Sequence, residues 1–235
     1  MNPVISLKDI AVSYNRSGNI FKKKSYYEAL KSVSFDIYQG ETLGIIGRNG
    51  AGKSTLLRLI ADVILPDKGK IVNHGVSVSL LALQTGFDLD LNGHDNAIIS
   101  GMLQGSSRRK VEEKLDEIQE YSELGDFFFE PVRTYSTGMR ARLGFSVSTL
   151  VSPDVLLIDE VLGVGDKYFR QKAEKTMLTK MQSQQTVVLV SHSHHQIAQL
   201  CDRAILIDEG ISVISGVPHD VLDIYEARLN ASSTG

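Results

Sequence analysis

The segment that most constrains the fold is Gly47–Ser54, which reads GRNGAGKS and fits the phosphate-binding pattern GxxxxGK[ST]. An apolar stretch, residues 42–46, precedes it, and residues 55–60 follow it with helical spacing. The pattern requires this context of strand, glycine-rich loop and helix. Its glycines leave room for backbone N–H groups around phosphate oxygens, and the start of the helix faces the same anion. The segment therefore predicts a nucleoside triphosphate site in an α/β fold.

Each position of this loop has a predicted role in binding ATP and Mg²⁺. The Lys53 ammonium can reach the β- and γ-phosphates, and the Ser54 hydroxyl can bind the metal ion. The predicted nucleotide-binding residues of the loop are Gly47, Arg48, Asn49, Gly50, Ala51, Gly52, Lys53, Ser54 and Thr55.

Composition narrows the class of protein. The chain has 235 residues, of which 42% are apolar and 23% charged, and this suits one large domain with a sizeable core. The formal net charge of −3 does not favour binding to nucleic acid. The single cysteine excludes an internal disulfide and fits a reducing compartment. We expect this residue, Cys201, to be a small buried side chain at the end of a helix.

The sequence predicts no insertion of this chain into a membrane. Residues 1–4 carry no basic region followed by a long apolar core, so no signal peptide is expected. No run approaches 18 consecutive apolar residues, which a membrane-spanning helix would need. Any role at a membrane is therefore expected to act through a partner.

Apolar patterns predict a sheet of mixed direction with helices between its strands. Residues 4–14 and 30–37 are expected to be antiparallel strands, and residues 208–210 a hairpin turn. Continuous apolar runs, typical of parallel strands covered on both faces, occur at residues 155–158, 186–190 and 204–207.

The helical part of the chain is expected from about residue 92 to residue 150. Within it, the spacing of Val111, Leu115 and Ile118 predicts one helix over residues 108–121 with a single buried face. Residues 218–229 are expected to form a last amphipathic helix.

A second candidate site lies where the strand at residues 155–158 ends in Asp159 and Glu160. An apolar strand that ends in two acids is what a phosphate-loop ATPase needs opposite its loop. Asp159 can hold Mg²⁺ through water, and Glu160 can polarise the attacking water as general base.

A third segment, Tyr135–Met139, reads YSTGM and opens a helix with Ser136 as its N-cap. Taken alone it also fits an ordinary capped helix. Placed about 20 residues before Asp159, it resembles the LSGGQ signature of ABC-type ATPases. The resemblance implies that Ser136 and Gly138 bind the γ-phosphate of ATP held by a second copy of the chain, in a head-to-tail dimer.

The same resemblance implies roles for other residues. His192 would contact the γ-phosphate and the catalytic carboxylate, Gln84 would reach Mg²⁺, and Asp166 would close the loop after the catalytic acid. Tyr14 is the first candidate to stack on adenine, with Tyr26 and Tyr27 as alternates. The neighbouring His194 and His195 are expected at a helix start rather than in a metal site.

The resemblance covers about residues 4–225 and implies a P-loop NTPase core, a mostly parallel sheet with helices on both faces. The core would comprise residues 1–84 and 151–235, including an antiparallel β subdomain. Residues 85–150, approximately, would be an inserted helical subdomain with the signature, and the whole would be a single domain over residues 1–235.

Finer features are similar to the ATPase subunits of bacterial polysaccharide exporters, which move O-antigen, capsule or teichoic acid on lipid carriers. They are the sequence YSTGM, Val161 after the catalytic acid, and residues 80–87. This likeness implies an integral-membrane partner subunit, a lipid-linked polysaccharide as cargo, and a place on the cytoplasmic face of the bacterial inner membrane. Ala82, near Gln84, stands where many relatives have an acid. Thr137 and Met139 depart from the general signature, so slow turnover is expected.

Two segments are open to alternative interpretations. Residues 15–27 contain three lysines beside aromatic residues, and they can be a solvated loop or a contact for anionic lipid head groups or a carrier pyrophosphate. Residues 127–129 are three phenylalanines, for which helical-subdomain core is favoured over a docking patch.

Rival functions are an importer or small-molecule exporter ATPase, a soluble ABC ATPase of DNA repair or translation, and a regulatory module with a decayed site. The soluble class usually carries a long coiled-coil insertion or two ATPase units, and neither occurs here. Salt-sensitive binding to nucleic acid would favour it. Steady MgATP hydrolysis would exclude the decayed module.

Overall fold

The computed structural model describes residues 2–15, 26–81, 86–151, 153–159, 166–181 and 183–233. The chain forms two compact units. The first unit comprises residues 1–76, 158–160 and 184–235, and the second comprises residues 77–157 and 161–183.

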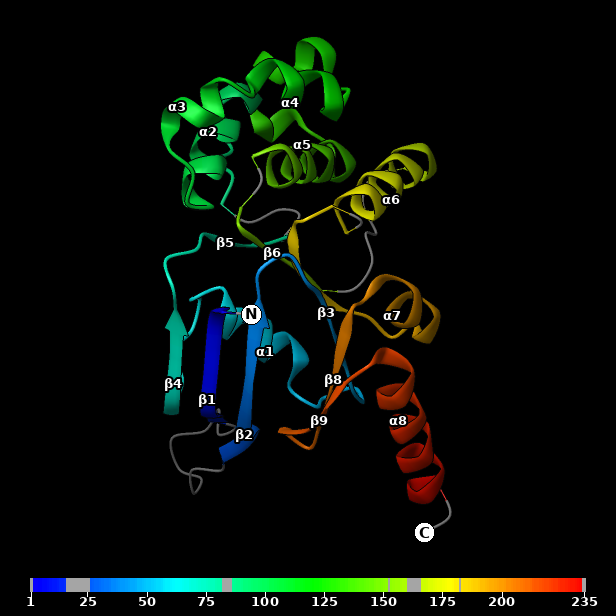
Figure 1. Ribbon diagram of the computed structural model, residues 1–235. Helices are drawn as coiled ribbons and strands as arrows, with labels where there is room; N and C mark the ends of the chain where they lie inside the picture. Colours follow the sequence, from blue (N-terminus) through cyan, green and yellow to red (C-terminus); the bar gives the residue numbers. More distant parts are fainter. Residues whose placement is uncertain are drawn as a thin grey trace, which may run out of the picture. The chain divides into compact units, whose positions relative to one another are not determined.

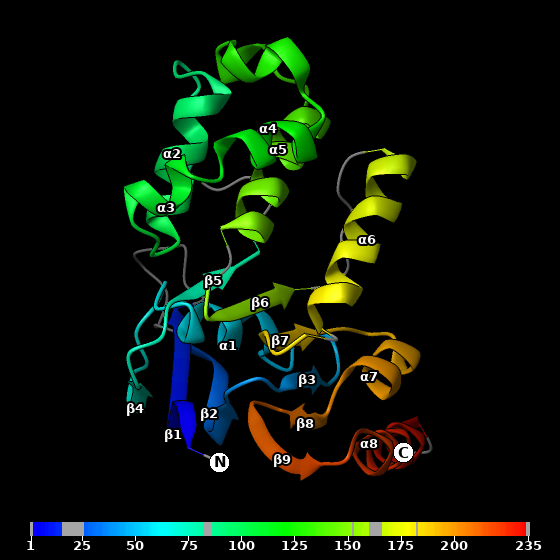
Figure 2. The ribbon, with the colours of Figure 1, turned by 45° about the horizontal axis from the view of Figure 1, so that its top comes forward.

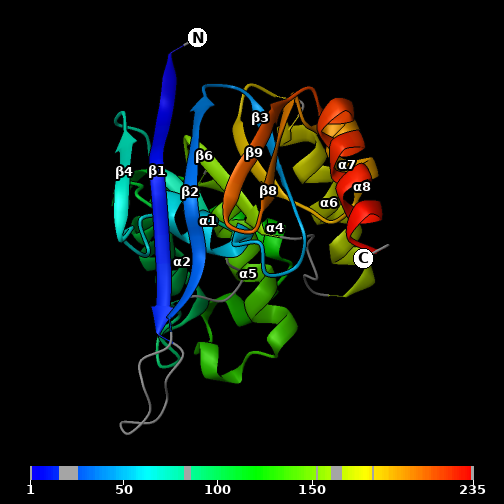
Figure 3. The same cartoon turned by 90° about the horizontal axis from the view of Figure 1, so that it is seen from below.

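The first unit contains a mixed sheet in the order β4-β1-β2-β9-β8-β3-β7, whose strands are labelled in Figure 1, except β7, which is labelled in Figure 2. The bounds of these strands are β1 Pro3–Asn15, β2 Tyr26–Tyr38, β3 Thr42–Ile46, β4 Lys68–Asn73, β7 Thr186–Val190, β8 Arg203–Asp208 and β9 Ile211–Gly216. The long strands β1 and β2 run antiparallel, with Ile5 opposite Ile37 and Leu7 opposite Phe35, as predicted. Figure 3 shows β4, β1 and β2 side by side.

The parallel part of this sheet is buried, as the continuous apolar runs predict. Every residue of β3 and β7 is buried, and β3 pairs in parallel with both β7 and β8. The helices of this unit are α1 (Lys53–Ile60), α7 (His194–Leu200) and α8 (Pro218–Ser233), and they lie on both faces of the sheet. The β8–β9 hairpin turns at Glu209 and Gly210, which have φ of 47° and 78°, so the predicted turn at residues 208–210 is confirmed.

The second unit is largely helical, and Figure 2 shows α2 to α5 gathered together. Its helices are α2 Gly93–Leu103, α3 Arg108–Glu112, α4 Leu115–Ser122, α5 Thr137–Leu150 and α6 Lys167–Met181, with short 3₁₀ turns at Gly125–Phe129 and Val132–Thr134. Strand β5 (Val78–Leu80) pairs in parallel with the first residues of β6 (Val155–Asp159). The core of the unit consists of Ala97, Ile118, Leu124, Phe128, Val132, Tyr135, Leu143 and Val147.

The predicted single helix over residues 108–121 is wrong, because the chain breaks between α3 and α4 at Glu113 and Lys114. The break lets two fully buried side chains meet different neighbours. Val111 packs against Gly101 of α2, while Ile118 joins the core of the unit. Of the three phenylalanines at residues 127–129, the middle one is buried in that core and the outer two are exposed. The core interpretation therefore holds for Phe128 alone.

Candidate nucleotide-binding site

The phosphate loop joins β3 to α1 in a backbone conformation that glycine alone adopts without strain. Gly47, Gly50 and Gly52 have φ of 154°, 81° and 99°. A Cβ on Gly47 would lie 2.0 Å from the Ile207 carbonyl oxygen, and one on Gly52 would lie 2.5 Å from the Ala29 carbonyl oxygen. The loop is therefore pressed against β8 and β2 too closely for any side chain at these two positions.

Lys53 lies within this loop and is 7% exposed. Its Nζ donates to the carbonyl oxygens of Gly47 at 2.7 Å and Arg48 at 3.0 Å. Gly52 is the N-cap of α1 and has no side chain to cap the first turn of the helix. A buried ammonium and an uncapped helix start together create a positive environment suited to phosphate.

A cavity of about 520 Å³ opens beside the loop, within the first unit. It brings together predicted site residues from three distant parts of the sequence: Lys53 and Ser54, Asp159, and His192. The remaining lining residues are Tyr27, Ala29, Asn49, Gly50, Gly52, Thr55 and Val190. Asp159 ends β6 and His192 follows β7, so both side chains are placed by the carboxyl ends of buried strands.

Among the three candidate tyrosines, the structure places Tyr27 in the lining of the cavity. Its hydroxyl donates to the Gly50 carbonyl oxygen at 2.7 Å. Tyr14 lies opposite Tyr27 in the β1–β2 ladder, and its hydroxyl donates to Thr55 Oγ1 at 3.5 Å. Tyr26 is 61% exposed. The adenine contact of Tyr14 stays a prediction, and the bond from Tyr27 to the loop was not expected from the sequence.

The signature segment begins α5 in the second unit. Ser136 is the N-cap, and its Oγ accepts from the Met139 amide at 3.2 Å, which confirms the predicted cap. Gly138 lies in the first turn, where an added Cβ would meet Ser136 Oγ at 3.7 Å, an ordinary contact. The first turn of α5 therefore has a capped start and a small residue with space around it.

Asp166 lies directly before α6. Its Oδ1 accepts from the Phe169 amide at 3.0 Å, and its Oδ2 forms an ion pair with Arg142 of α5. The Phe169 amide, and to a lesser degree the Arg142 guanidinium, lower the pKa of the Asp166 carboxyl below its usual value. The Arg142 contact was missed from the sequence, because nothing in the spacing of two residues 24 apart predicts an ion pair.

Two predicted site residues, Gln84 and Glu160, lie outside the described residues, as do most of the segment at residues 15–27 and Val161. His194 and His195 are the first two residues of α7, as expected, and His194 Nδ1 lies 3.1 Å from Glu226 Oε1. Cys201 ends α7 and is buried, as expected, and burial raises the pKa of its thiol to about 12. Of the helices in the described ranges, none has the length and apolar character to cross a bilayer.

The comparisons with known proteins agree with this arrangement. The model of the ABC transporter family matches residues 30–163. The O-antigen export system ATP-binding protein RfbB of Klebsiella pneumoniae is 40% identical over 223 residues, which are 95% of this chain and 90% of that protein. The teichoic acids export ATP-binding protein TagH of Bacillus cereus is 38% identical over 97% of this chain, but this chain spans 43% of its length.

Solved structures show the same fold. A dimeric ATP-binding cassette in a post-hydrolysis state, bound to ADP and Pi, matches with a TM-score of 0.71 at 19% identity, over 91% of this chain and 98% of that chain. The fold is therefore that of an ATP-binding cassette, a P-loop NTPase core with a mixed sheet and helices on both faces. This chain belongs to the ABC transporter family, in the group that includes ATP-binding proteins of O-antigen and teichoic acid export systems.

Proposed function

We propose that this protein is the ATP-hydrolysing subunit of an ABC transporter that exports a lipid-linked polysaccharide, such as O-antigen, capsule or teichoic acid. The observation that carries the proposal is the cavity of the first unit, where Lys53, Ser54, Asp159 and His192 meet. A buried ammonium beside an uncapped helix start suits phosphate, and a hydroxyl and a carboxylate suit Mg²⁺, as phosphoryl transfer in phosphate-loop ATPases uses them. The His192 imidazole lines the same cavity.

The residues of the loop fit ATP and Mg²⁺. The backbone cradle at Gly47 and Gly52 admits no Cβ, and the Lys53 ammonium is held beside it. Ser54 and Asp159 both line the cavity and offer oxygen atoms, the ligands that Mg²⁺ prefers. In our proposal they hold the metal ion together with Gln84, and Tyr14 stacks on adenine. When bound, the ion neutralises charge on the phosphates.

Hydrolysis needs a base and a group that orients it. Glu160 takes the proton of the attacking water, and His192 contacts both Glu160 and the γ-phosphate. Ser136 and Gly138 bind the γ-phosphate of ATP held by a second copy, so two chains enclose two nucleotides. The dimeric cassette bound to ADP and Pi, which shares this fold, is consistent with such a dimer. Dimer opening or product release limits turnover.

Transport requires a partner in the membrane. The export relatives are named as ATP-binding proteins of export systems. We propose that this chain binds an integral-membrane subunit at the cytoplasmic face of the inner membrane, and that this subunit conducts the polysaccharide. The names of these relatives favour export over the importer and over the soluble ATPase.

The proposal is tested first with purified protein. Wild type should hydrolyse MgATP, and Glu160→Gln should bind ATP and form a stable dimer with turnover reduced at least 100-fold. Turnover by Glu160→Gln at the wild-type rate would contradict the assignment of the base.

The cargo is tested in the source bacterium by replacing wild type with Glu160→Gln. Accumulation of lipid-linked polymer inside the cell, with loss of surface polysaccharide, is the expected result. An unchanged lipid-linked pool with a normal surface would contradict the export function and leave the ATPase activity standing.

A further inference from the structure

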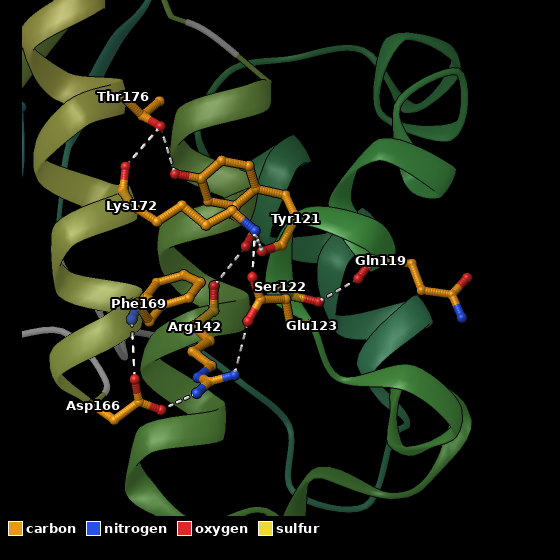
Figure 4. A network of polar contacts seen from close by, with 10 residues as sticks. Gln119, Tyr121, Ser122, Glu123, Arg142, Asp166, Phe169, Lys172 and Thr176 are labelled. Carbon is orange, nitrogen blue, oxygen red and sulfur yellow. Dashed lines mark hydrogen bonds and ion pairs between the residues drawn. The ribbon is translucent and has the colours of Figure 1, made fainter.

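Four charged side chains of the second unit form an alternating network that joins three helices (Figure 4). We call Asp166, Arg142, Glu123 and Lys172, in this order of contact, the charge network. Glu123 ends α4, Arg142 lies in α5, Asp166 lies directly before α6, and Lys172 lies in the second turn of α6. Acid and base alternate along it, so every charge has an opposite neighbour.

Arg142 is the centre of the network. One end of its guanidinium pairs with Asp166, and the other lies 3.5 Å from Glu123 Oε2. The same group lies over the Phe169 ring, 5.2 Å from its centroid, and the side chain is 19% exposed. A planar fork that holds two carboxylates and stacks on a ring has little freedom to rotate.

Lys172 completes the network on the other side of Glu123. Its Nζ lies 2.7 Å from Glu123 Oε1 and donates to the Tyr121 carbonyl oxygen at 2.9 Å. It also lies 4.3 Å from the centroid of the Tyr121 ring. The Tyr121 hydroxyl in turn shares a hydrogen bond of 2.7 Å with Thr176 Oγ1. These contacts hold α4 against α6, and the Glu123 carboxylate bridges the Arg142 guanidinium and the Lys172 ammonium.

Glu123 ends α4 in the left-handed conformation, with φ of 55°, which is a common way for a helix to end. The turn at this helix end places its carboxylate between α5 and α6. Here Arg142 and Lys172 both hold the carboxylate.

Ordinary surface pairs in the same unit look different. Arg108–Glu112 and Arg109–Glu113 are i,i+4 pairs within one helix, with side chains 44–89% exposed. Pairs of that kind stabilise a protein very little. The charge network joins separate helices, and three of its four side chains are 19–34% exposed. Its contacts are less screened by water, and the network fixes the positions of α4, α5 and α6 relative to one another.

We propose that Arg142 is a positioning residue, which holds Asp166 and the start of α6 at a fixed place on the signature helix α5. This inference rests on the proposed function. Arg142 lies six residues after Ser136, about 9 Å along the same helix. Five residues separate Asp166 from Glu160 in the sequence. The network therefore joins α5 to Asp166 as one rigid element. In the proposed function, α5 meets the nucleotide of a second copy, and Asp166 ends the segment that follows the catalytic acid Glu160.

The test is Arg142→Met, which removes the charge and keeps an unbranched side chain beside Phe169. We expect kcat for MgATP to fall at least tenfold, while the Kd of a fluorescent ATP analogue for the isolated chain stays within twofold, because the nucleotide cavity lies in the first unit. In the Glu160→Gln background, the same change should weaken the ATP-dependent dimer at least tenfold, measured by analytical ultracentrifugation.

Matched variants separate positioning from general damage. Arg109→Met removes an arginine of the same unit from an exposed pair and should leave kcat within twofold. Arg142→Lys retains the charge but cannot hold two carboxylates with a planar fork, so its kcat should lie between that of Arg142→Met and that of wild type. If Arg142→Met does not fold, Asp166→Asn serves in its place, since it keeps an oxygen for the Phe169 amide and loses the charge that Arg142 pairs with.

A folded Arg142→Met with kcat within twofold of wild type would overturn the inference, as would an equal loss of kcat in Arg109→Met. A tenfold loss of nucleotide affinity in Arg142→Met would overturn it too, because the damage would then extend to the other unit. Wild-type protein without MgATP hydrolysis would instead overturn the proposed function, so the two failures are distinguishable.

Discussion

The phosphate loop and the first turn of α5 are both predicted to meet nucleotide phosphate, but the protein holds them in different ways. The loop is fixed by its own unit: neighbouring strands exclude a Cβ at Gly47 and Gly52, and Lys53 bonds to loop carbonyls. The first turn of α5 has a side-chain cap at Ser136, and Met139 packs against the core of the second unit, while Gly138 has space around it.

This difference separates two reasons for a glycine in a motif. The fold of the first unit requires glycine at position 47, because a side chain there would collide with backbone atoms. The fold of the second unit does not require glycine at position 138. If it is required, the requirement comes from a ligand that approaches α5 from outside the chain. The two motifs should therefore respond differently to the same substitution, in stability and in activity.

The largest expected effect is that of Gly47→Ala. The new Cβ would overlap the Ile207 carbonyl oxygen, so the loop must move. We therefore expect the free energy of unfolding to fall by at least about 3 kcal/mol, and nucleotide binding to be lost. Urea unfolding and titration with a fluorescent ATP analogue measure both. The control is Gly75→Ala, at φ 92° with no atom within 4 Å of the added Cβ, where strain alone should cost about 1–2 kcal/mol. Equal losses of stability in the two variants would show that the close contact with the Ile207 carbonyl oxygen adds nothing to the strain of a positive φ.

Gly138→Ala should show the opposite combination. Ala is the better helix former, so we expect unchanged stability or a gain of up to about 1 kcal/mol. We expect MgATP turnover to fall at least tenfold, about 1.4 kcal/mol in activation free energy, because the Cβ would stand where the second copy's phosphate is proposed to bind. Steady-state kinetics alongside unfolding curves test this. Wild-type turnover would mean that Gly138 meets no ligand.

Ser136→Ala should reduce stability by about 1 kcal/mol, since it removes the side-chain cap that accepts from the Met139 amide. Ser136→Asn retains a capping oxygen and should restore most of that loss. The measurement is the urea midpoint of each variant. Recovery of stability without recovery of turnover would show that the hydroxyl has a second role beyond the cap.

A smaller effect is expected at the edge of the nucleotide cavity. Tyr27→Phe removes the hydroxyl that donates to Gly50, and should weaken binding of an ATP analogue by about 0.5–1 kcal/mol, roughly two- to fivefold. Tyr14→Phe is the matched control, because its hydroxyl bond of 3.5 Å is long, and it should change affinity less. A greater loss in Tyr14→Phe would show that Tyr14 supports the loop more than Tyr27 does.

The smallest expected signal is the reactivity of Cys201. Its pKa is raised to about 12 by burial, so at pH 8 only about one thiol in ten thousand is ionised, and native protein should resist alkylation for hours. Cys201 Sγ would lie 2.9 Å from a Cβ on Gly44, in β3 directly before the phosphate loop. Its labelling therefore reports opening of the first unit. Gly47→Ala should accelerate it, and Gly138→Ala should not. Rapid labelling of wild type would contradict the burial argument.

Much of the fold and site could be predicted because the signals are local. The phosphate loop, the buried strands at residues 155–158 and 186–190 and the cap at Ser136 depend on spacing within a few residues. Even the order of motifs along the chain is a property of the sequence. The roles of Gln84 and Glu160 stay predictions, since both lie outside the described residues.

Tertiary structure alone decided the rest, because it depends on which distant segments pack together. The break between α3 and α4 follows from Val111 and Ile118 having different neighbours. The bond from Tyr27 to Gly50 joins residues 23 apart, and the Arg142–Asp166 pair joins residues 24 apart. The sequence by itself determined which chemistry the chain carries and in what order. Packing determined which side chains hold that chemistry in place, since contact energies between distant residues exist only once the chain is folded.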